Sequence, residues 1–251
     1  MKTKRLDFWL MDDYIIQQYF IFLPFLMWGI NQAKEFQNTL SDLDLAQLIG
    51  DVFWKLKKVK WSNERIQNEL GRRTIEAIIS SWESCYMGAC VDFSLVFLME
   101  LKKLLPQDKL AIGCELLRRK STWNYGFHLF LKDNSVQPSR IIDFVSKNEV
   151  EIYQGAYTNS LNGTEIDQLA LYELSAQEVS AQDSFLSLAQ KMNINLPPEL
   201  FQAYLSKLQQ DNTDAQFQKF QANSPRIIKI HWNTQEQTKH ELLSSLMEQP
   251  L

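Results

Sequence analysis

The chain is poor in cysteine and histidine, with three residues of each type among its 251. Cys85, Cys90 and Cys114 are odd in number and lack the spacing of a metal site, which argues against a disulfide framework and against a bound metal. We therefore expect free thiols in a reducing compartment such as the cytoplasm, and no cofactor.

An excess of positive charge is also missing. The formal net charge is -4 and the isoelectric point is near 5.5. A protein that binds nucleic acid usually carries a basic patch that neutralises phosphates, and this composition gives no global reason to expect one. Two short basic runs, at 55–60 and 118–120, are typical of solvated faces. The composition therefore predicts no nucleic-acid partner.

The chain has no apolar run that reaches the roughly 20 residues needed to cross a bilayer as a helix. The longest candidate, 19–30, is interrupted by Pro24, preceded by Asp12 and Asp13, and followed by no clear small-x-small cleavage site. We expect a buried or surface-packed helix that is broken at the proline, with membrane contact as the alternative. Neither a cleaved signal peptide nor an integral membrane span is expected.

Hydrophobic residues make up 45% of the chain, enough for one large domain or for a core domain with an appendage. Apolar spacing divides the chain into three parts. Residues 1–84 form a helical N-terminal part, with helices predicted at 44–58 and 63–82. Residues 85–163 combine a buried helix with antiparallel strands, and residues 164–251 form a mainly helical C-terminal appendage with a late strand. The predicted fold class is α+β.

Local signals place several of these elements. Ser62 stands where an N-cap would, directly before the helix predicted over 63–82. Leu110, Ile112 and Cys114 alternate along one face of a predicted strand. In the C-terminal appendage we predict helices near 186–192 and 198–208, a flexible loop or helix end over the Gln-rich stretch 209–223, a strand at 227–232, and a last helix at 239–248.

Cys90, His128 and Asp143 occur in the order and in the local contexts that a thiol active site requires. Cys90 follows the turn-like run 87–89 and precedes the apolar segment 91–105, so it lies at the predicted N-terminus of a buried helix. The unpaired N–H groups and the positive dipole end of a first helical turn favour the thiolate, which is the nucleophilic form. Cys90 is therefore the candidate nucleophile.

His128 and Asp143 lie on two predicted strands that are joined by the polar stretch 133–139, which is typical of a hairpin connection. If Lys132 pairs with Ser139, His128 lies directly opposite Asp143, and the Cβ atoms of opposed residues are roughly 4.5 to 5.5 Å apart. A carboxylate at this distance can hold an imidazole in one tautomer. The three contexts together predict a Cys-His-Asp triad.

The order of motifs around the triad matches a known pattern. A Gly-x-Cys sequence at 88–90 opens the central helix, a strand follows at 109–117, and strands that carry the histidine and the aspartate follow at 126–130 and 141–143. This order resembles the transglutaminase-like branch of the papain-like cysteine enzymes. The resemblance covers roughly the middle quarter of the chain and implies a papain-like core with a catalytic triad.

Two residues depart from the pattern of that family. Phe130 stands two residues after the histidine, where Trp is frequent, and Phe144 follows the aspartate, where Pro is frequent. The spacing of the triad also resembles the arylamine N-acetyltransferases of the same superfamily. Their Arg-Gly-Gly-x-Cys signature and their Gly-rich segment after the aspartate are missing here, so that branch is the less favoured alternative.

The resemblance implies acyl transfer through a thioester, with a protein or peptide as substrate. Cys90 would attack an amide carbonyl, His128 would move the proton to the leaving amine, and Asp143 would orient the imidazole. Release by water would make the chain a thiol protease or a glutamine deamidase, and release by an amine would make it a transglutaminase. We favour hydrolysis. A non-catalytic protein-interaction module on the same fold is the alternative from another class.

Other residues offer weaker alternatives. Cys85 is a second candidate nucleophile, although nothing places it at a helix start. His231 is a second candidate base, but we find no acidic residue at hairpin distance from it. Residues 82–84 occupy the region where papain-like enzymes bring a side chain to the oxyanion hole, but the Gln of papain is absent. The sequence therefore assigns one oxyanion donor, the backbone N–H of Cys90, and leaves the second open.

Overall fold

The computed structural model describes residues 39–120, 125–146, 149–159, 162–195, 197–223 and 228–233. The apolar segment 19–30 and the last predicted helix at 239–248 lie outside the described residues. No helix in these described ranges is long and apolar enough to cross a membrane.

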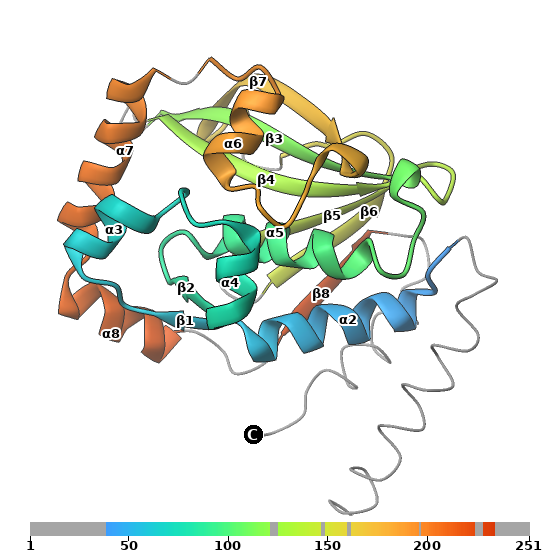
Figure 1. The fold of residues 1–251 in the computed structure, drawn as a ribbon, viewed down its shortest axis with the longest axis horizontal. Coiled ribbons are helices and arrows are strands. Elements are labelled where there is room, and N and C mark those ends of the chain that lie inside the picture. Colours follow the sequence, from blue (N-terminus) through green and yellow to red (C-terminus); the bar gives the residue numbers. More distant parts are fainter. Residues whose placement is uncertain are drawn as a thin grey trace, which may run out of the picture. The chain divides into compact units, whose positions relative to one another are not determined.

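The described elements form an α+β fold, as predicted (Figure 1). The helices are α2 (Asp42–Lys55), α3 (Asn63–Glu69), α4 (Ile75–Ser81), α5 (Ala89–Leu101), α6 (Phe185–Lys191), α7 (Pro198–Asp211) and α8 (Asp214–Asn223). The strands are β1 (Lys57–Val59), β2 (Glu83–Cys85), β3 (Leu110–Arg119), β4 (Tyr125–Asp133), β5 (Arg140–Ser146), β6 (Glu149–Gln154), β7 (Ile166–Ser175) and β8 (Lys229–Asn233). Short 3-10 turns lie at Gln107–Lys109 and Ala176–Glu178.

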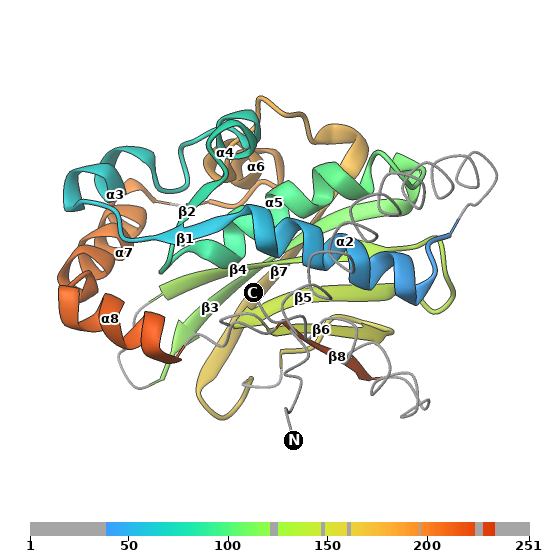
Figure 2. The same cartoon turned by 90° about the horizontal axis from the view of Figure 1, so that it is seen from below.

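Six strands form one sheet in the order β7-β3-β4-β5-β6-β8. The prediction of an antiparallel sheet is correct for four of the neighbouring pairs and wrong for β6 and β8, which run parallel. A separate small sheet pairs β1 with β2, also in parallel, so the N-terminal part is not purely helical. Figure 2 shows that α2, α4 and α5 lie on one side of the large sheet, which leaves α5 between the sheet and the outer helices.

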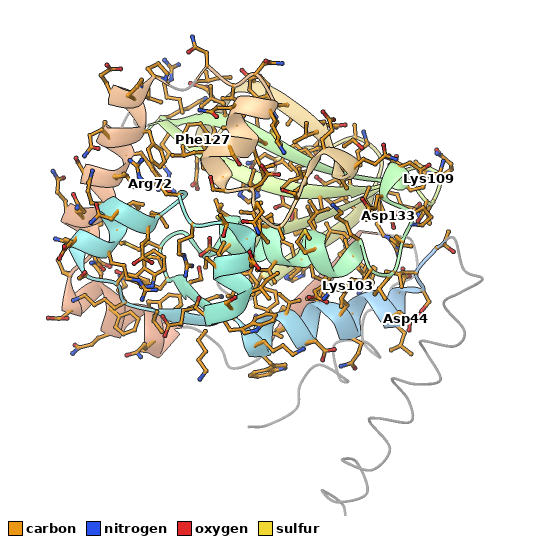
Figure 3. The ribbon with its side chains drawn as sticks, in the orientation of Figure 1. Asp44, Arg72, Lys103, Lys109, Phe127 and Asp133 are labelled. Carbon is orange, nitrogen blue, oxygen red and sulfur yellow. The ribbon has the colours of Figure 1, made fainter. Side chains whose placement is uncertain are left out.

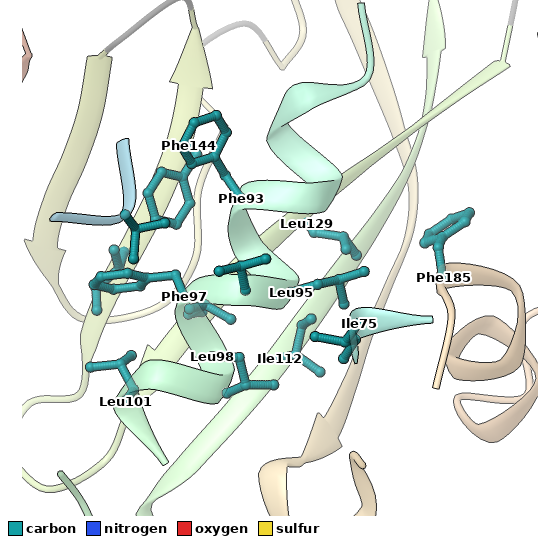
Figure 4. Close-up of a cluster of buried hydrophobic side chains, with 14 of the residues drawn as sticks. Ile75, Phe93, Leu95, Phe97, Leu98, Leu101, Ile112, Leu129, Phe144 and Phe185 are labelled. Carbon is teal, nitrogen blue, oxygen red and sulfur yellow. The ribbon is translucent and has the colours of Figure 1, made fainter. Parts of the chain in front are cut away.

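Helix α5 forms the centre of the hydrophobic core because it is apolar on nearly every side, as expected for a buried helix. Its buried side chains include Phe93, Leu95, Phe97, Leu98 and Leu101. Figure 4 shows these side chains packed against residues of β3, β4 and β5, among them Ile112, Leu129 and Phe144. Burial of this helix on the sheet fixes the position of its first turn, where Cys90 lies.

The helix predicted over 63–82 is two helices, α3 and α4. Ser62 caps α3 as predicted, because its side chain accepts a hydrogen bond from the backbone N–H of Arg65. Gly71 follows with a φ of 71°, which a glycine adopts without steric cost, and the chain turns there. Thr74 then caps α4. The chain therefore turns at the left-handed Gly71 after α3, and Thr74 starts the second helix, α4.

The C-terminal part differs from the prediction in two places. The chain after 163 does not become helical at once, because β7 adds a strand of ten residues to the edge of the sheet beside β3. The Gln-rich stretch 209–223, predicted as a flexible loop or a helix end, does contain the end of α7, but most of the rest forms a further helix, α8. Thr213 accepts a hydrogen bond from the backbone N–H of Gln216 at the start of α8. Phe217 and Phe220 of that helix pack against Tyr86.

A second buried cluster covers the other face of the sheet and leaves no room for a side chain at one position of β3. The ring of Phe130 stacks on Tyr157 with centroids 3.8 Å apart and an interplanar angle of 8°. A Cβ atom at Gly113 would lie 2.0 Å from Cζ of Phe130, so the ring lies flat against the bare backbone. This close approach, and not a special φ, requires glycine at 113.

Replacing Gly113 by alanine should therefore lower the free energy of unfolding by about 3 kcal/mol, because a fully buried ring has to move. Chemical denaturation followed by fluorescence measures the effect. Gly126→Ala on β4 is the control, since its new Cβ would lie 3.1 Å from the movable end of Leu117. Equal losses of stability in the two variants would contradict this account of Gly113.

Candidate active site

Cys90 is the second residue of α5. Strand β2 ends at Cys85, and a turn closed by the hydrogen bond from the Gly88 N–H to the Cys85 carbonyl leads into the helix. A Cβ atom at Gly88 would lie 2.9 Å from Cδ1 of Leu70, so a close contact holds this turn in place. The thiol of Cys90 is partly exposed and free. Its position at a helix start is the one predicted.

The other two thiols are buried and free. Cys85 is 0% exposed on β2, and burial raises the pKa of its thiol above the usual value. Burial likewise raises the pKa of Cys114 to about 12. Neutral, inaccessible thiols are poor nucleophiles. Of the three cysteines, Cys90 alone is both accessible and at a helix N-terminus.

His128 on β4 and Asp143 on β5 are in direct contact. The Nε2 atom of His128 lies 2.5 Å from Oδ1 of Asp143, and their side chains are 13% and 3% exposed. Cys90 is the other charged neighbour of the imidazole, because its negative charge contributes to the raised pKa of His128. Because Nε2 faces Asp143, Nδ1 is the ring nitrogen left for the thiol. The structure thus brings together all three residues predicted from the sequence.

The strand register behind this contact differs from the prediction. Asp133 pairs with Arg140, and Phe130, not His128, lies opposite Asp143. The prediction was therefore wrong by two residues. A shift of two keeps every side chain on its face of the sheet, and diagonal neighbours lie within reach of long side chains. His128 accordingly meets Asp143 along the diagonal.

The polar contacts of His128 favour its charged form. Burial alone disfavours the imidazolium and lowers the pKa, but the hydrogen bond with Asp143 and the negative charges of Asp143 and Cys90 act in the opposite direction. The pKa of His128 consequently lies well above its usual value of 6.5. At neutral pH these negative charges therefore favour the imidazolium form of the ring.

A second buried carboxylate lies beside His128 and was missed by the sequence reasoning. Glu115 on β3 is 0% exposed and directly opposite His128 in the register. Its Oε2 accepts hydrogen bonds from the Tyr157 hydroxyl at 3.0 Å and from Nδ2 of Asn159 at 2.7 Å. Its Oε1 has no hydrogen-bond partner among the described residues. No local pattern marks Glu115, because only the pairing of β3 with β4 brings it to the histidine.

Helix α7 brings a tyrosine to the same region. The ring of Phe127, next to His128 in sequence, packs against Phe185 of α6 and Tyr204 of α7, with centroids 5.5 and 6.4 Å apart. Figure 3 shows Phe127 beside these two helices. Burial and the charges of Cys90 and Cys85 raise the pKa of Tyr204, so its hydroxyl stays protonated at neutral pH. The predicted C-terminal appendage therefore forms one wall of the site.

The alternative site residues considered from the sequence do not lie beside His128 and Asp143. His231 lies on β8 at the edge of the sheet, separated from β4 by β5 and β6, and it is exposed. An acidic residue, Glu151, does lie opposite it in the register, contrary to expectation. Ser84 is buried and donates to the Cys85 carbonyl.

The described residues contain no cluster of three or more side chains that could hold a metal ion. The chain matches no protein-family model, and no curated protein matches it in sequence. A functional assignment therefore has to be argued from the geometry of this site.

Proposed function

We propose that this chain is a cysteine-dependent hydrolase or acyltransferase of the transglutaminase-like kind, acting on amide groups of proteins or peptides. The observation that carries the proposal is the position of His128, whose Nε2 lies 2.5 Å from Oδ1 of Asp143 and whose imidazole also feels the negative charge of Cys90. A nucleophile, a base and a group that orients the base, in contact in that order, are the parts of a covalent acyl-transfer site. The partly exposed thiol leaves room for a substrate carbonyl.

The residues would divide the chemistry as follows. The Cys90 thiolate attacks the carbonyl carbon of an amide, and the imidazolium of His128 gives its proton to the departing amine, which leaves a thioester on Cys90. Asp143 holds Nε2 so that Nδ1 points to the reacting atoms. The first backbone N–H groups of α5, including that of Cys90, have no partner within the helix and can donate to the carbonyl oxygen.

We favour water as the group that resolves the thioester. His128, now neutral, would take a proton from water and direct the hydroxide to the carbonyl, which releases the acid and restores the thiol. An amine acceptor would need a second binding site that excludes water. Hydrolysis needs no such addition, so a thiol protease or a glutamine deamidase is favoured over a transglutaminase.

The test is mass spectrometry of a mixture of unfolded proteins and added primary amine after incubation with the chain. We expect a change that Cys90→Ala abolishes: a gain of about one dalton for deamidation, a lost peptide for proteolysis, or an added amine for transamidation. Cys85→Ala, which removes a buried thiol, should behave like the wild type. Identical spectra for the wild type and Cys90→Ala would contradict the proposal and favour a non-catalytic protein-interaction module.

A further inference from the structure

A small cavity lies next to the residues that flank the nucleophile and its base. Its wall includes Gly88 and Val91, which stand on either side of Cys90 in the sequence, and Phe127, which precedes His128 on β4. Consecutive Cα atoms are about 3.8 Å apart, so this wall begins within the length of one side chain of both residues. A group that a substrate carries next to its reacting carbonyl can therefore reach the cavity.

The rest of the wall comes from the turn after α3 and from helices α6 and α7. It includes Gly71, Phe185, Phe201 and Tyr204. A Cβ atom at Gly71 would lie 3.2 Å from Cζ of Phe201 and 3.3 Å from Cδ1 of Phe185, so two rings lie close to the bare backbone of the glycine. The cavity has a volume of about 20 Å³. This volume is little more than the roughly 10 to 15 Å³ that one water-sized group needs.

The polarity of the cavity suits an apolar group. Among the side chains that line it, the hydroxyl of Tyr204 is the one polar group. A buried water molecule needs roughly two to four polar partners, so these side chains would leave it underbonded. A methyl group needs no partner and gains free energy by leaving water. Size and polarity together therefore favour a methyl-sized apolar occupant.

We propose that this cavity is a specificity pocket, which takes the side chain of an alanine-sized residue on the acyl side of the amide that Cys90 attacks. This inference rests on the proposed function of Cys90 as a nucleophile. The acyl part of the substrate stays on the enzyme as a thioester after the amine has left, so the pocket holds it through both steps. In an alanyl peptide the attacked carbonyl is bonded to a carbon with a methyl branch, whereas the side chain of glutamine has no such branch. The pocket thus favours peptide cleavage over deamidation.

The test is the rate at which Cys90 is alkylated by the N-acetyl chloromethyl ketones of glycine, alanine, valine and leucine. The thiolate displaces chloride in each case, so the rates compare side chains at constant chemistry. In the wild type the alanine reagent should react at least about tenfold faster than the leucine reagent, because a small pocket rejects additional methylene groups. Peptide mass spectrometry measures the label on each cysteine.

Two variants of Val91 change the volume of the pocket in opposite directions. Val91→Ala enlarges it, so the leucine reagent should gain about tenfold on the alanine reagent. Val91→Ile fills it, so the alanine reagent should lose its advantage over the glycine reagent. Met99→Ala is the matched control, because Met99 is also partly buried on α5 but does not line the cavity. It should keep the wild-type order of rates.

The buried Cys85 and Cys114 report unfolding in the same samples, since both become labelled if the core opens. If Val91→Ala is unfolded by this criterion, Phe201→Leu enlarges the same pocket from α7. A wild type without a preference for the alanine reagent overturns the inference. A preference that stays unchanged in the folded variants with an enlarged or a filled pocket overturns it as well.

Iodoacetamide carries no side chain and separates the pocket from the proposed function. If His128→Ala slows its reaction with Cys90 while the wild type shows no preference among the ketones, the pocket assignment fails and the proposed function stands. If His128→Ala leaves the iodoacetamide rate unchanged, the proposed function fails, and the pocket assignment fails with it.

Discussion

Replacing His128 by alanine should slow the alkylation of Cys90 about a hundredfold near a pH of about 6, because the thiolate loses its paired imidazolium. The raised pKa of His128 means that the wild-type ring is charged at this pH and favours the thiolate. The variant keeps the partial positive charge of the helix N-terminus, which favours the thiolate less than a full charge does. Stopped-flow alkylation with iodoacetamide over a range of pH measures the change, which should shrink as the pH rises and the thiol ionises by itself.

His231→Ala is the matched control, since His231 is an exposed histidine on β8, away from the site. It should alkylate like the wild type. The rates at Cys85 and Cys114, followed in the same digests, show whether a variant has opened the core. If His128→Ala and His231→Ala give the same curve, His128 does not act on Cys90, and the triad has no catalytic role here.

The second large effect is expected for Asp143→Asn, which should lower the rate of acyl transfer from an activated ester by about a thousandfold or more. Asparagine nearly matches the size of aspartate, so the fold should remain. The amide can donate a hydrogen bond to Nε2 and thereby favour the wrong tautomer, and it no longer stabilises the imidazolium by its charge. We therefore also expect the pKa of His128 to fall.

A burst of ester cleavage, followed in a single turnover, measures acylation of Cys90, and NMR titration of the imidazole measures the pKa of His128. Glu151→Gln is the matched control, because Glu151 lies opposite Asp143 on β6 and its replacement removes a neighbouring carboxylate. Asp143→Asn with wild-type acylation would contradict the assigned role. A fall in acylation without a fall in the pKa of His128 would mean that Asp143 acts mainly by orienting the ring.

Local signals in the sequence were sufficient to place Cys90 at a helix start and His128 next to Asp143, and to predict most of the elements that carry them. The apolar segment after Cys90 has to be buried whatever surrounds it, so a thiol at its start falls at a helix N-terminus. Side chains alternate between the two faces of a strand, so a register error of two residues still leaves His128 and Asp143 on the same face. For that reason the triad contact could be predicted although the pairing could not.

The hairpin register depended on side chains that meet only in the folded chain. Asp133 accepts hydrogen bonds from the backbone N–H of Ser135 and from the guanidinium of Arg140, so it belongs both to the turn and to the last pair of the ladder. Arg140 also donates to the Leu40 carbonyl, far away in sequence. A buried arginine with these partners selects one register over its neighbours, and no pattern of turn residues contains that information.

The sequence by itself thus determined which cysteine lies at a helix start and which histidine and aspartate share one face of two neighbouring strands, because the periodicity of each element marks those positions. Only the tertiary structure decided which other groups surround them. The sheet placed Glu115 opposite His128, strand β1 placed Lys58 beside α5, and α7 placed Tyr204 against Phe127. Such neighbours come from elements far apart in the chain, and local propensity fixes the type of an element but not what packs against it.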